Sequence, residues 1–312
     1  HPEAGDIVIA EDPYNITWTK KGLGVSDVFL EYSTDSGTNW TAVVAGNATV
    51  PNTGTYYWSS VPGGALSSFC KIRVTDLNNV NATDSGASFF DLRGDLTVTR
   101  PAGGESWNLA TTENINWTKK GNIAAVDISY SANNGTNWTT LISGVTASNL
   151  SWAWNITNAT QLTTQGKIKV ADTSNANIVY ALSQGTFGVQ GRLVIDQPAA
   201  SGIVMQYGGA PYNITWTRYG AIGNVNLTYS TDGGLTYPNT IDTNVNATFG
   251  TPYAWGVPDA IGVNLSVKIV DVDNPAVTNV SSNKFAVKGG VLLISPNGNE
   301  NWLKGTTQQI QW

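Results

Sequence analysis

Apolar and polar residues alternate with a period of two along most of the chain, in runs of five to seven residues separated by clusters of Gly, Asn, Asp and Pro. This period is typical of β-strands that pack on one face and meet solvent on the other. In the run Asn15–Thr19, Ile16 and Trp18 fall on one face and the polar residues on the other. No stretch has helical periodicity. The pattern predicts an all-β chain.

The strand pattern also repeats along the sequence, with a period of about 98 residues. The run Asn15–Thr19 returns as Asn114–Thr118 and Asn213–Thr217, and begins again at Gln309–Trp312. Further blocks recur in the same order and spacing, which indicates tandem copies of one module. These blocks begin at Tyr32, Tyr130 and Tyr229, at Tyr56, Trp152 and Tyr253, at Ile72, Ile168 and Val267, and at Phe90, Phe187 and Phe285.

About seven strands per copy, with a Trp in an early strand, predict tandem immunoglobulin-like antiparallel β-sandwiches. A single large barrel is less favoured, because one copy already has the size of an independent domain. We predict Ig-like repeats at 1–94, 95–191 and 192–289, and the start of a fourth at 290–312. The joints between repeats are too short to act as flexible tethers, so we expect the sandwiches to stack as a stiff rod.

The repeats are out of phase with the two ends of the chain. Pro2–Asp6 corresponds to Pro101–Glu105, so the first repeat lacks the opening strand that Leu96–Arg100 supplies to the second. Val291–Ser295 is an extra copy of that strand. Either the sequence is a window cut from a longer array, or the extra strand of one subunit completes the open sheet of the next and builds a filament.

Charge and residue usage exclude several classes of function. The chain has 312 residues, a net charge of −6 and only 12% charged residues. An acidic chain so poor in Lys and Arg has no electrostatic footprint for nucleic acid, and no apolar run approaches the roughly 18 residues of a membrane span. One cysteine, Cys70, and one histidine, His1, exclude internal disulfides, Cys/His zinc sites and most hydrolase triads. Because residue 1 is not Met, we expect a processed chain or an internal piece of a longer one.

Asn-x-Ser/Thr sequons are unusually frequent, with 15 of the 32 Asn in this motif. Many lie on the solvent face that the alternation predicts, where a glycan leaves the core undisturbed. Heavy N-glycosylation would also explain how a surface so poor in charge stays in solution. The alternative is that Asn and Thr are simply abundant in turns and strands. The predicted glycosylation sites are Asn15, Asn39, Asn47, Asn81, Asn116, Asn134, Asn137, Asn149, Asn155, Asn158, Asn213, Asn226, Asn246, Asn264 and Asn279.

The sequons also bear on which sites carry sugar together and on the kind of organism that makes the protein. Close sites such as Asn134 and Asn137 are not expected to be occupied together. A eukaryotic secreted protein of this kind would usually carry disulfides, which a single cysteine cannot form within one chain. N-glycosylation with almost no cysteine therefore favours an archaeal or other prokaryotic cell-surface protein, located outside the cell.

The repeat contains four short motifs: Pro-x-Gly-Gly-Glu-x-Trp at 101–107, Ile-x-Trp at 115–117, Tyr-Ser-x-Asp-x-Gly-x-x-Trp at 32–40 and Trp-x-x-Val-Pro at 58–62. With them the repeat resembles the Ig-like modules of the Ser/Thr-rich cell-wall-synthesis and anchored-membrane-protein family, over essentially the full chain. The third repeat departs from the pattern, with Tyr207 and Tyr237 in place of Trp. The resemblance implies an Ig-like fold and a role at cell walls or surfaces, and it carries over no catalytic residue.

Two local motifs resemble functional motifs but have simpler explanations. Ser33–Trp40 looks like the Asp box of sialidases, but the repeat is far too long for propeller blades and Asn133 replaces the Asp in the second copy. Ordinary Asx-turn chemistry explains the segment. Arg93-Gly94-Asp95 matches an integrin-binding tripeptide, yet it lies in a joint and the other joints differ, which favours coincidence.

The acidic residues offer little chemistry. Asp271, Asp273 and Asn274-Pro275 could supply oxygen ligands to calcium, as could Asp76 with Asp84, but solvated turn carboxylates are the simpler interpretation. Asp76, Asp172 and Asp271 recur singly at strand ends in every repeat, so the fold explains them better than a glycosidase pair does. We predict no enzyme activity, no metal site and no cofactor other than covalent glycans.

The sequence therefore predicts a non-enzymatic extracellular glycoprotein, the rigid shaft of a cell-surface filament, stalk or surface layer, that self-associates or continues a longer array. Trp18, Trp117 and Trp216 are the predicted core anchors. The first alternative is a carbohydrate-binding adhesin, in which exposed Trp rings stack on sugars. A second alternative is the non-catalytic spacer of a secreted hydrolase. The Trp residues proposed for sugar binding are Trp107, Trp152 and Trp302.

Overall fold

The structure of the chain is a computed structural model that describes residues 1–22, 24–248 and 252–312. It divides into two compact units. Unit 1 comprises His1–Trp107, Thr112–Asn155 and Thr163–Val189, and unit 2 comprises Asn108–Thr111, Ile156–Leu162 and Gln190–Trp312. Among the described residues, only two 3₁₀ turns interrupt the strands and loops: η1 (Ala45–Asn47) and η2 (Ala147–Asn149). The all-β prediction is confirmed.

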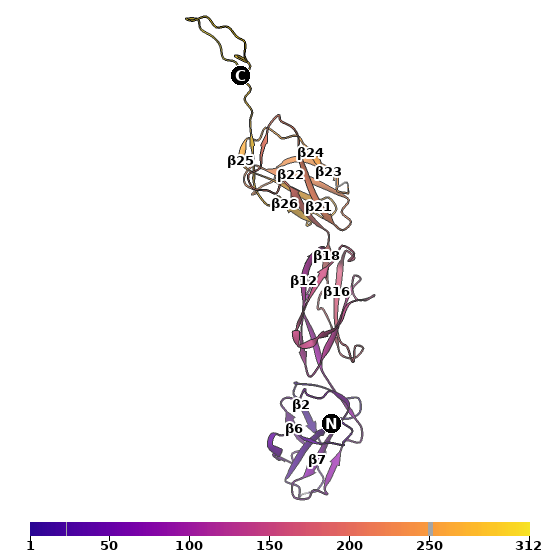
Figure 1. Cartoon of the computed structure of the whole chain (residues 1–312). Coiled ribbons are helices and arrows are strands. Elements are labelled where there is room, and N and C mark those ends of the chain that lie inside the picture. The colour runs from indigo at the N-terminus through magenta and orange to yellow at the C-terminus, as the bar shows by residue number, and fades with distance from the viewer. Residues whose placement is uncertain (23, 249–251) are drawn as a thin grey trace. The chain divides into compact units, whose positions relative to one another are not determined.

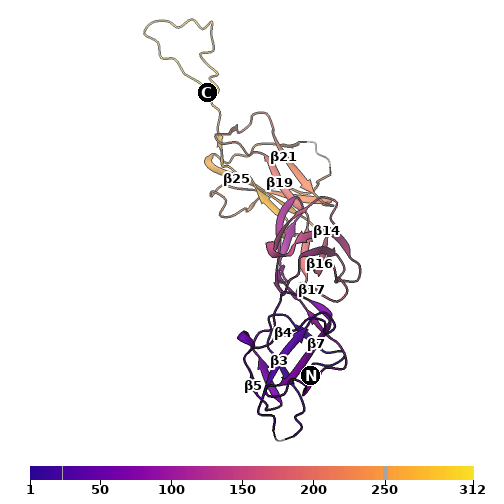
Figure 2. The same ribbon diagram turned by 60° about the horizontal axis from the view of Figure 1, so that its bottom comes forward.

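The first repeat forms a large sheet and a two-stranded one (Figures 1 and 2). The large sheet has the order β1-β9-β7-β3-β4, with β5 paired to β3 and β8 paired to β7, and the small sheet pairs β2 with β6. The strands are β1 (Ile7–Ile9), β2 (Tyr14–Thr17), β3 (Asp27–Ser33), β4 (Thr41–Ala42), β5 (Val50–Pro51), β6 (Thr55–Trp58), β7 (Ser67–Asp76), β8 (Thr83–Ser85) and β9 (Phe90–Arg93).

The second repeat has a similar large sheet, of six strands instead of seven, and a three-stranded small one. The orders are β11-β18-β16-β13-β14, with β17 on β16, and β10-β12-β15. The strands are β10 (Asp95–Arg100), β11 (Ser106–Asn108), β12 (Thr111–Lys120), β13 (Ala125–Ser131), β14 (Thr139–Thr146), β15 (Ser151–Ile156), β16 (Thr163–Asp172), β17 (Tyr180–Leu182) and β18 (Phe187–Gln190).

The third repeat has the same two sheets as the second. Its orders are β20-β27-β25-β22-β23, with β26 on β25, and β19-β21-β24. The strands are β19 (Arg192–Gln197), β20 (Val204–Gln206), β21 (Tyr212–Tyr219), β22 (Asn224–Ser230), β23 (Asn239–Asn246), β24 (Tyr253–Trp255), β25 (Gly262–Asp271), β26 (Thr278–Val280) and β27 (Phe285–Lys288). The chain is thus built of Ig-like β-sandwiches in tandem. The exact repeat boundaries and the stacking as a rod stay predictions.

Each sandwich core contains one aromatic pair at the same place. In the second repeat Trp154 is 4% exposed and its ring centroid lies 5.0 Å from that of Tyr130. Burial of the Tyr130 phenol raises its pKa to about 12. The matching pairs, Tyr32 with Trp58 and Tyr229 with Trp255, have centroid separations of 5.3 and 5.4 Å. Period-two alternation in the strands delivers these rings to the interior.

The three predicted core anchors differ in burial. Trp117 is 1% exposed and its Nε1 donates a hydrogen bond to the Ala147 carbonyl oxygen at 3.0 Å. Trp18 and Trp216 are only half-buried, although both pack against their cores. The Trp18 ring lies at the core margin, where its Nε1 donates to the Asn52 side chain at 2.8 Å. The prediction of a core anchor is confirmed for Trp117, whereas Trp18 and Trp216 pack against their cores as partly buried rings.

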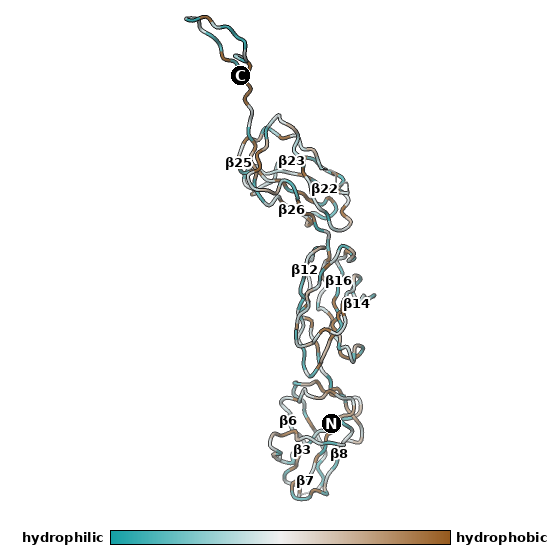
Figure 3. The backbone as a smooth tube through the Cα atoms, in the orientation of Figure 1, coloured by the Kyte–Doolittle hydropathy of each residue, from teal (hydrophilic) through white to brown (hydrophobic). Residues whose placement is uncertain are grey.

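The C-terminal segment carries apolar residues outside any strand. Val291 and Leu292 are 84% and 78% exposed, and the apolar trace that leaves β27 is visible in Figure 3. One isolated bridge joins Ser295 to Gln311, with Gln311 N donating to the Ser295 carbonyl oxygen at 2.8 Å. The extra strand copy, Val291–Ser295, thus pairs with none of the strands that the structure describes in unit 2.

Candidate functional site

The 15 predicted glycosylation asparagines all lie among the described residues, and none of them is buried. Asn116, Asn226 and Asn279 are half-buried. A glycan on any of the others projects into solvent, as attachment to a folded chain requires. The exposed asparagines are Asn15, Asn39, Asn47, Asn81, Asn134, Asn137, Asn149, Asn155, Asn158, Asn213, Asn246 and Asn264.

Hydrogen bonds distinguish the sites, because sugar attaches to the side-chain nitrogen, Nδ2. Asn39 Nδ2 already donates to Asp35 Oδ2 at 2.6 Å. In Asn116 and Asn279 the oxygen is the engaged atom, which accepts from Ser151 Oγ at 2.8 Å and from Ile195 N at 2.9 Å respectively. Asn39 is therefore the least available of the exposed sites, since its acceptor would have to release the nitrogen.

The Asp-box-like segment is a tight turn held by its own side chain. Asp35 Oδ1 accepts hydrogen bonds from Asn39 N and Ser33 Oγ, each at 2.8 Å. The Asn39 backbone N–H, followed by the Asn39 and Ser33 side chains, lowers the pKa of Asp35 to about 2. In the second repeat Asn133 Oδ1 accepts from Asn137 N at 2.9 Å, so the turn forms without a charge. The motif is structural, as expected.

The aromatic residue of each such turn is covered by a cation. Arg73 Cζ lies 4.3 Å from the Trp40 ring centroid, and Lys169 Nζ lies 5.3 Å from that of Trp138. In the third repeat Lys268 Nζ lies 5.5 Å from the Tyr237 ring. Cation–π contacts of this kind occupy the ring face that a sugar would need. These rings pin the turns to the large sheet instead.

Of the three Trp residues predicted to be exposed for sugar binding, Trp107 is buried instead. Trp107 is 3% exposed, and its ring centroid lies 4.5 Å from that of Phe187 and 6.0 Å from that of Trp154. It belongs to the core because β11 turns this side chain inward. Trp152 is half-buried, and Trp302 is 47% exposed in the C-terminal segment.

The recurring acidic residues cap turns. Asp76 Oδ1 accepts from Asn78 N at 3.0 Å, and Asp172 Oδ1 accepts from Ser174 N at 3.0 Å. Asp271 does the same for the backbone N–H two residues further on, at 3.1 Å. In residues 1–22, 24–248 and 252–312 no group of three or more His, Cys, Asp or Glu side chains could hold a metal ion. The fold accounts for these carboxylates.

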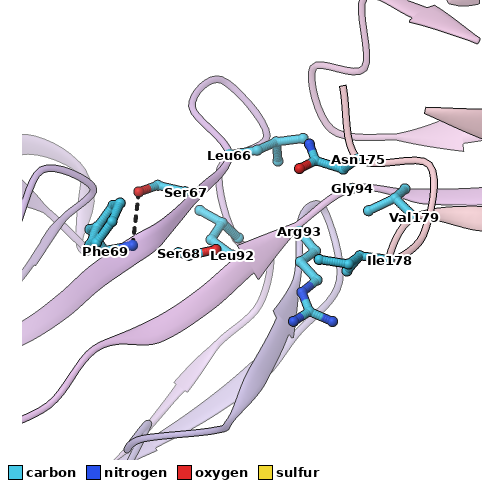
Figure 4. Close-up of a pocket in the computed structure, with 10 residues that line it drawn as sticks. All are labelled: Leu66, Ser67, Ser68, Phe69, Leu92, Arg93, Gly94, Asn175, Ile178 and Val179. Carbon is cyan, nitrogen blue, oxygen red and sulfur yellow. Dashed lines mark hydrogen bonds between the residues drawn. The ribbon is translucent and has the colours of Figure 1, made fainter. Parts of the chain in front are cut away.

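The Arg-Gly-Asp segment and the pocket beside it lie inside unit 1 (Figure 4). Arg93 ends β9 and Asp95 begins β10, with buried Gly94 between them. The Arg93 guanidinium pairs with the Asp91 carboxylate. Both flanking residues are strand residues, so the tripeptide does not form a protruding loop. The pocket has a mixed wall that includes Phe69, Ser67 and Ile178.

The joint glycines Gly94 and Gly191 are packing residues. A Cβ on Gly94 would lie 2.8 Å from Ile123 Cγ1 and 2.8 Å from the Lys120 carbonyl oxygen. In unit 2 a Cβ on Gly191 would lie 3.1 Å from Ile222 and 3.1 Å from the Tyr219 carbonyl oxygen. The sequence signal for this packing is a Gly at the same place in successive joints.

Comparisons with known proteins do not identify a family for the chain. No family model matches the chain, and no curated protein matches it. The chain is similar to fibronectin(III)-like modules of Clostridium thermocellum CbhA, at 19% identity and a TM-score of 0.23, covering 62% of this chain and 94% of that one. It is also similar to the N-terminal eight Ig domains of Down syndrome cell adhesion molecule, at 12% identity and a TM-score of 0.29, covering 92% and 35%.

A third similar structure is an I-band fragment of titin, at 10% identity and a TM-score of 0.27, covering 91% of this chain and 95% of that one. Likeness at these levels concerns the fold alone. None of the helices described in residues 1–22, 24–248 and 252–312 is long and apolar enough to cross a membrane. The chain is a tandem array of Ig-like sandwiches that carries 12 exposed sequon asparagines.

Proposed function

We propose that the chain is a non-enzymatic, N-glycosylated part of an extracellular cell-surface structure, the shaft of a filament, stalk or surface layer. The observation that carries the proposal is that none of 15 sequon asparagines is buried, in a chain with only 12% charged residues. Glycans on this surface would supply the hydration that charge does not, and would shield strand edges from other chains.

The mechanical part of the proposal rests on the joints. A single residue, Gly94, separates β9 from β10, and Gly191 alone separates β18 from β19. One glycine packed against Ile123 or Ile222 leaves no length of chain to behave as a random coil. Ladder hydrogen bonds in each sandwich resist extension along the strands.

The test is an intact mass and a glycopeptide map of the native protein. We expect a mass well above 33.1 kDa, with sugar on several exposed sequons and rarely on Asn134 and Asn137 together. Asn39 should be less occupied than Asn15 or Asn213, whose side-chain nitrogens are not engaged by a carboxylate. A bare chain would remove the main support for the glycoprotein shaft.

Carbohydrate binding is the second candidate, and the exposure of Trp302 favours it. At 47% exposure the ring could stack on a sugar. A glycan array separates the candidates, because a shaft binds no free sugar whereas an adhesin selects some. Trp302→Ala should abolish any signal, and Trp40→Ala, at a ring already covered by Arg73, should leave it unchanged.

A further inference from the structure

The three Asp-box-like turns differ in the two residues at the tip. The first repeat has Ser36-Gly37 there, the third has Gly233-Gly234, and the second has Asn134-Gly135. When glycine follows asparagine, its backbone nitrogen can reach the side-chain carbon of the asparagine, Cγ, and no Cβ obstructs the approach. The turn of the second repeat therefore holds two groups that can react with each other, and the other two turns do not.

The reactive pair lies at the surface of the turn. Asn134 is exposed, and both tip residues have a left-handed backbone, with φ +52° for Asn134 and +88° for Gly135. The Asn134 backbone N–H donates to the Gln165 carbonyl oxygen at 2.9 Å, but no hydrogen bond engages its side-chain amide in the part of the chain that the structure describes. The amide carbon is thus accessible to a nucleophile and to water.

A buried serine restrains the nucleophile. Ser131 is 1% exposed, and its Oγ accepts hydrogen bonds from Gly135 N at 2.9 Å and from Asn133 N at 3.3 Å. The same hydroxyl donates to Asn133 Oδ1 at 2.9 Å. Because the Gly135 nitrogen must give up its proton and turn towards Asn134 Cγ before it attacks, the bond to Ser131 opposes the reaction. Attack therefore needs a local opening of the turn.

We propose that Asn134 is a deamidation site in chains that carry no sugar at this residue, and that Ser131 sets the rate. The Gly135 nitrogen forms a bond to Asn134 Cγ, and its proton passes through solvent to Nδ2. The Cγ–Nδ2 bond then breaks, and ammonia leaves behind a cyclic imide. One water molecule opens the imide at either of its carbonyl groups, which gives aspartate or isoaspartate. Neither an oxidant nor a reductant is required.

The reaction changes both the modification site and the turn. Loss of Nδ2 removes the atom to which sugar attaches, so a deamidated chain cannot be glycosylated at Asn134. Isoaspartate adds one carbon to the backbone between the Asn134 N–H, which is bound to Gln165, and the Gly135 N–H, which is bound to Ser131. The turn then no longer fits both acceptors. Aspartate keeps the backbone unchanged and adds one negative charge.

A glycan at Asn134 protects the residue from the same reaction. With sugar on Nδ2 the leaving group is a bulky glycosylamine instead of ammonia, and the sugar covers the tip of the turn. The inference thus deepens the proposed function by naming the fate of this sequon when it is unoccupied, and only this protection rests on the proposed function. Deamidation of the bare chain requires no glycan.

The first test is a peptide map of the unglycosylated 312-residue chain, incubated at neutral pH and sampled over weeks. We expect the peptide that contains Asn134 to gain about one mass unit, as water replaces ammonia, and to become a substrate for protein isoaspartate methyltransferase. Asn137 in the same turn precedes Trp138 and should convert at least about tenfold more slowly. Equal conversion at Asn134 and Asn137, or none at Asn134, would overturn the proposal.

Variants at Ser131 test its role as the positioning residue. Ser131→Ala removes the acceptor of the Gly135 N–H and should speed conversion of Asn134 about fivefold, as expected for the loss of one hydrogen bond. Ser131→Cys fills a similar space with a weak acceptor, so it should resemble Ser131→Ala. If packing sets the rate instead of the hydrogen bond, Ser131→Cys will resemble the unchanged chain, and the role assigned to Ser131 is wrong.

Two controls separate this effect from a general loosening of the chain. Ser33→Ala removes the equivalent acceptor in the first repeat and should leave the conversion of Asn134 unchanged. The other Asn-Gly pair of the sequence, Asn297-Gly298, should convert at the same rate in all variants. If Ser131→Ala speeds conversion of Asn137 or Asn297 as much as that of Asn134, the chain has loosened as a whole, which contradicts a specific role for Ser131.

These measurements fail separately from the proposed function. Deamidation of the bare chain with no sugar on the native protein would support the Asn134 site and remove the glycoprotein. Sugar on the native protein, with an Asn134 that does not convert in the bare chain, would do the reverse.

Discussion

The first and second repeats of unit 1 carry the same motifs at the same spacing, yet their small sheets differ by one strand. β12 has β10 on one side and β15 on the other, whereas β2 has β6 alone among the described strands. Val170 is fully buried beneath the complete sheet, and its counterpart Val74 is half-buried. The strand that follows each joint glycine therefore completes the core of the repeat that it opens.

The largest effect is expected from removing the core Trp of each repeat, Trp117 in the second and Trp18 in the first. Trp117→Ala should destabilise the second repeat by about 3 to 5 kcal/mol, because it empties a fully buried indole site and removes the hydrogen bond from Trp117 Nε1 to the Ala147 carbonyl oxygen. Trp18→Ala should cost the first repeat about 1 to 3 kcal/mol, since that residue is already partly exposed.

Hydrogen exchange in the intact chain measures both, because it reports local unfolding of β12 and of β3 separately. Trp216→Ala is the informative third variant. Its ring is half-buried even though β19 pairs with β21, so it should behave like Trp18→Ala. If all three variants cost the same, burial does not distinguish the repeats and the comparison fails.

Most of the fold could be predicted from the periodicity of apolar and polar residues. A period of two with a repeat of about 98 residues predicts Ig-like sandwiches, because strand faces are set by local alternation. Burial of a particular ring depends on what covers it. Trp18 and Trp117 share the Ile-x-Trp motif, and the neighbours that cover Trp117, such as Ala147 in η2, come from elsewhere in the chain. Trp107, expected to be exposed, is covered in the same way by Phe187.

The candidate site was easier to predict than its environment. Sequons are read directly from the sequence, and alternation predicts which of their side chains face solvent. Asn39 is the exception that sequence alone does not reveal, because its nitrogen is held by a carboxylate four residues earlier in a folded turn. Packing at Gly94 was likewise invisible, since it depends on Ile123 in the next repeat.

A smaller effect is expected at the joint. Gly94→Ala places a methyl group 2.8 Å from Ile123 Cγ1 and from the Lys120 carbonyl oxygen, and should cost about 1 to 3 kcal/mol through overpacking. Gly191→Ala, with 3.1 Å to its nearest atoms, should cost less. Gly64→Ala meets nothing within 4 Å and is the control, with an expected change within about 0.5 kcal/mol.

Calorimetry of the full chain follows these variants. Gly94→Ala should lower the transitions of unit 1 and Gly191→Ala those of unit 2. Equal behaviour of Gly94→Ala and Gly64→Ala would show that the joint relaxes freely, and the tight link between β9 and β10 would lose its support.

The smallest effect is expected from the charge of Asp35, which distinguishes the Asp-box-like turn of the first repeat from that of the second. The hydrogen bond from Asn39 N, with those from the Asn39 and Ser33 side chains, holds the pKa of Asp35 at about 2, below the ordinary value of 3.8. A folded-state pKa below the unfolded value stabilises the folded state above about pH 4, and this contribution is lost as the pH falls towards 2. The second repeat has Asn133 at the same place, which cannot titrate.

Asp35→Asn should therefore keep the turn, as Asn133 does, and remove its acid sensitivity. We expect the variant to melt slightly lower than the unchanged chain at pH 7, where the charged Asp35 stabilises the folded state, and the difference to shrink as the pH falls from 5 to 2. Because every other carboxylate is common to both proteins, the difference between them isolates Asp35. Parallel curves over the whole range would mean that the turn of the first repeat gains nothing from its charge, and that it is equivalent to the uncharged turn of the second.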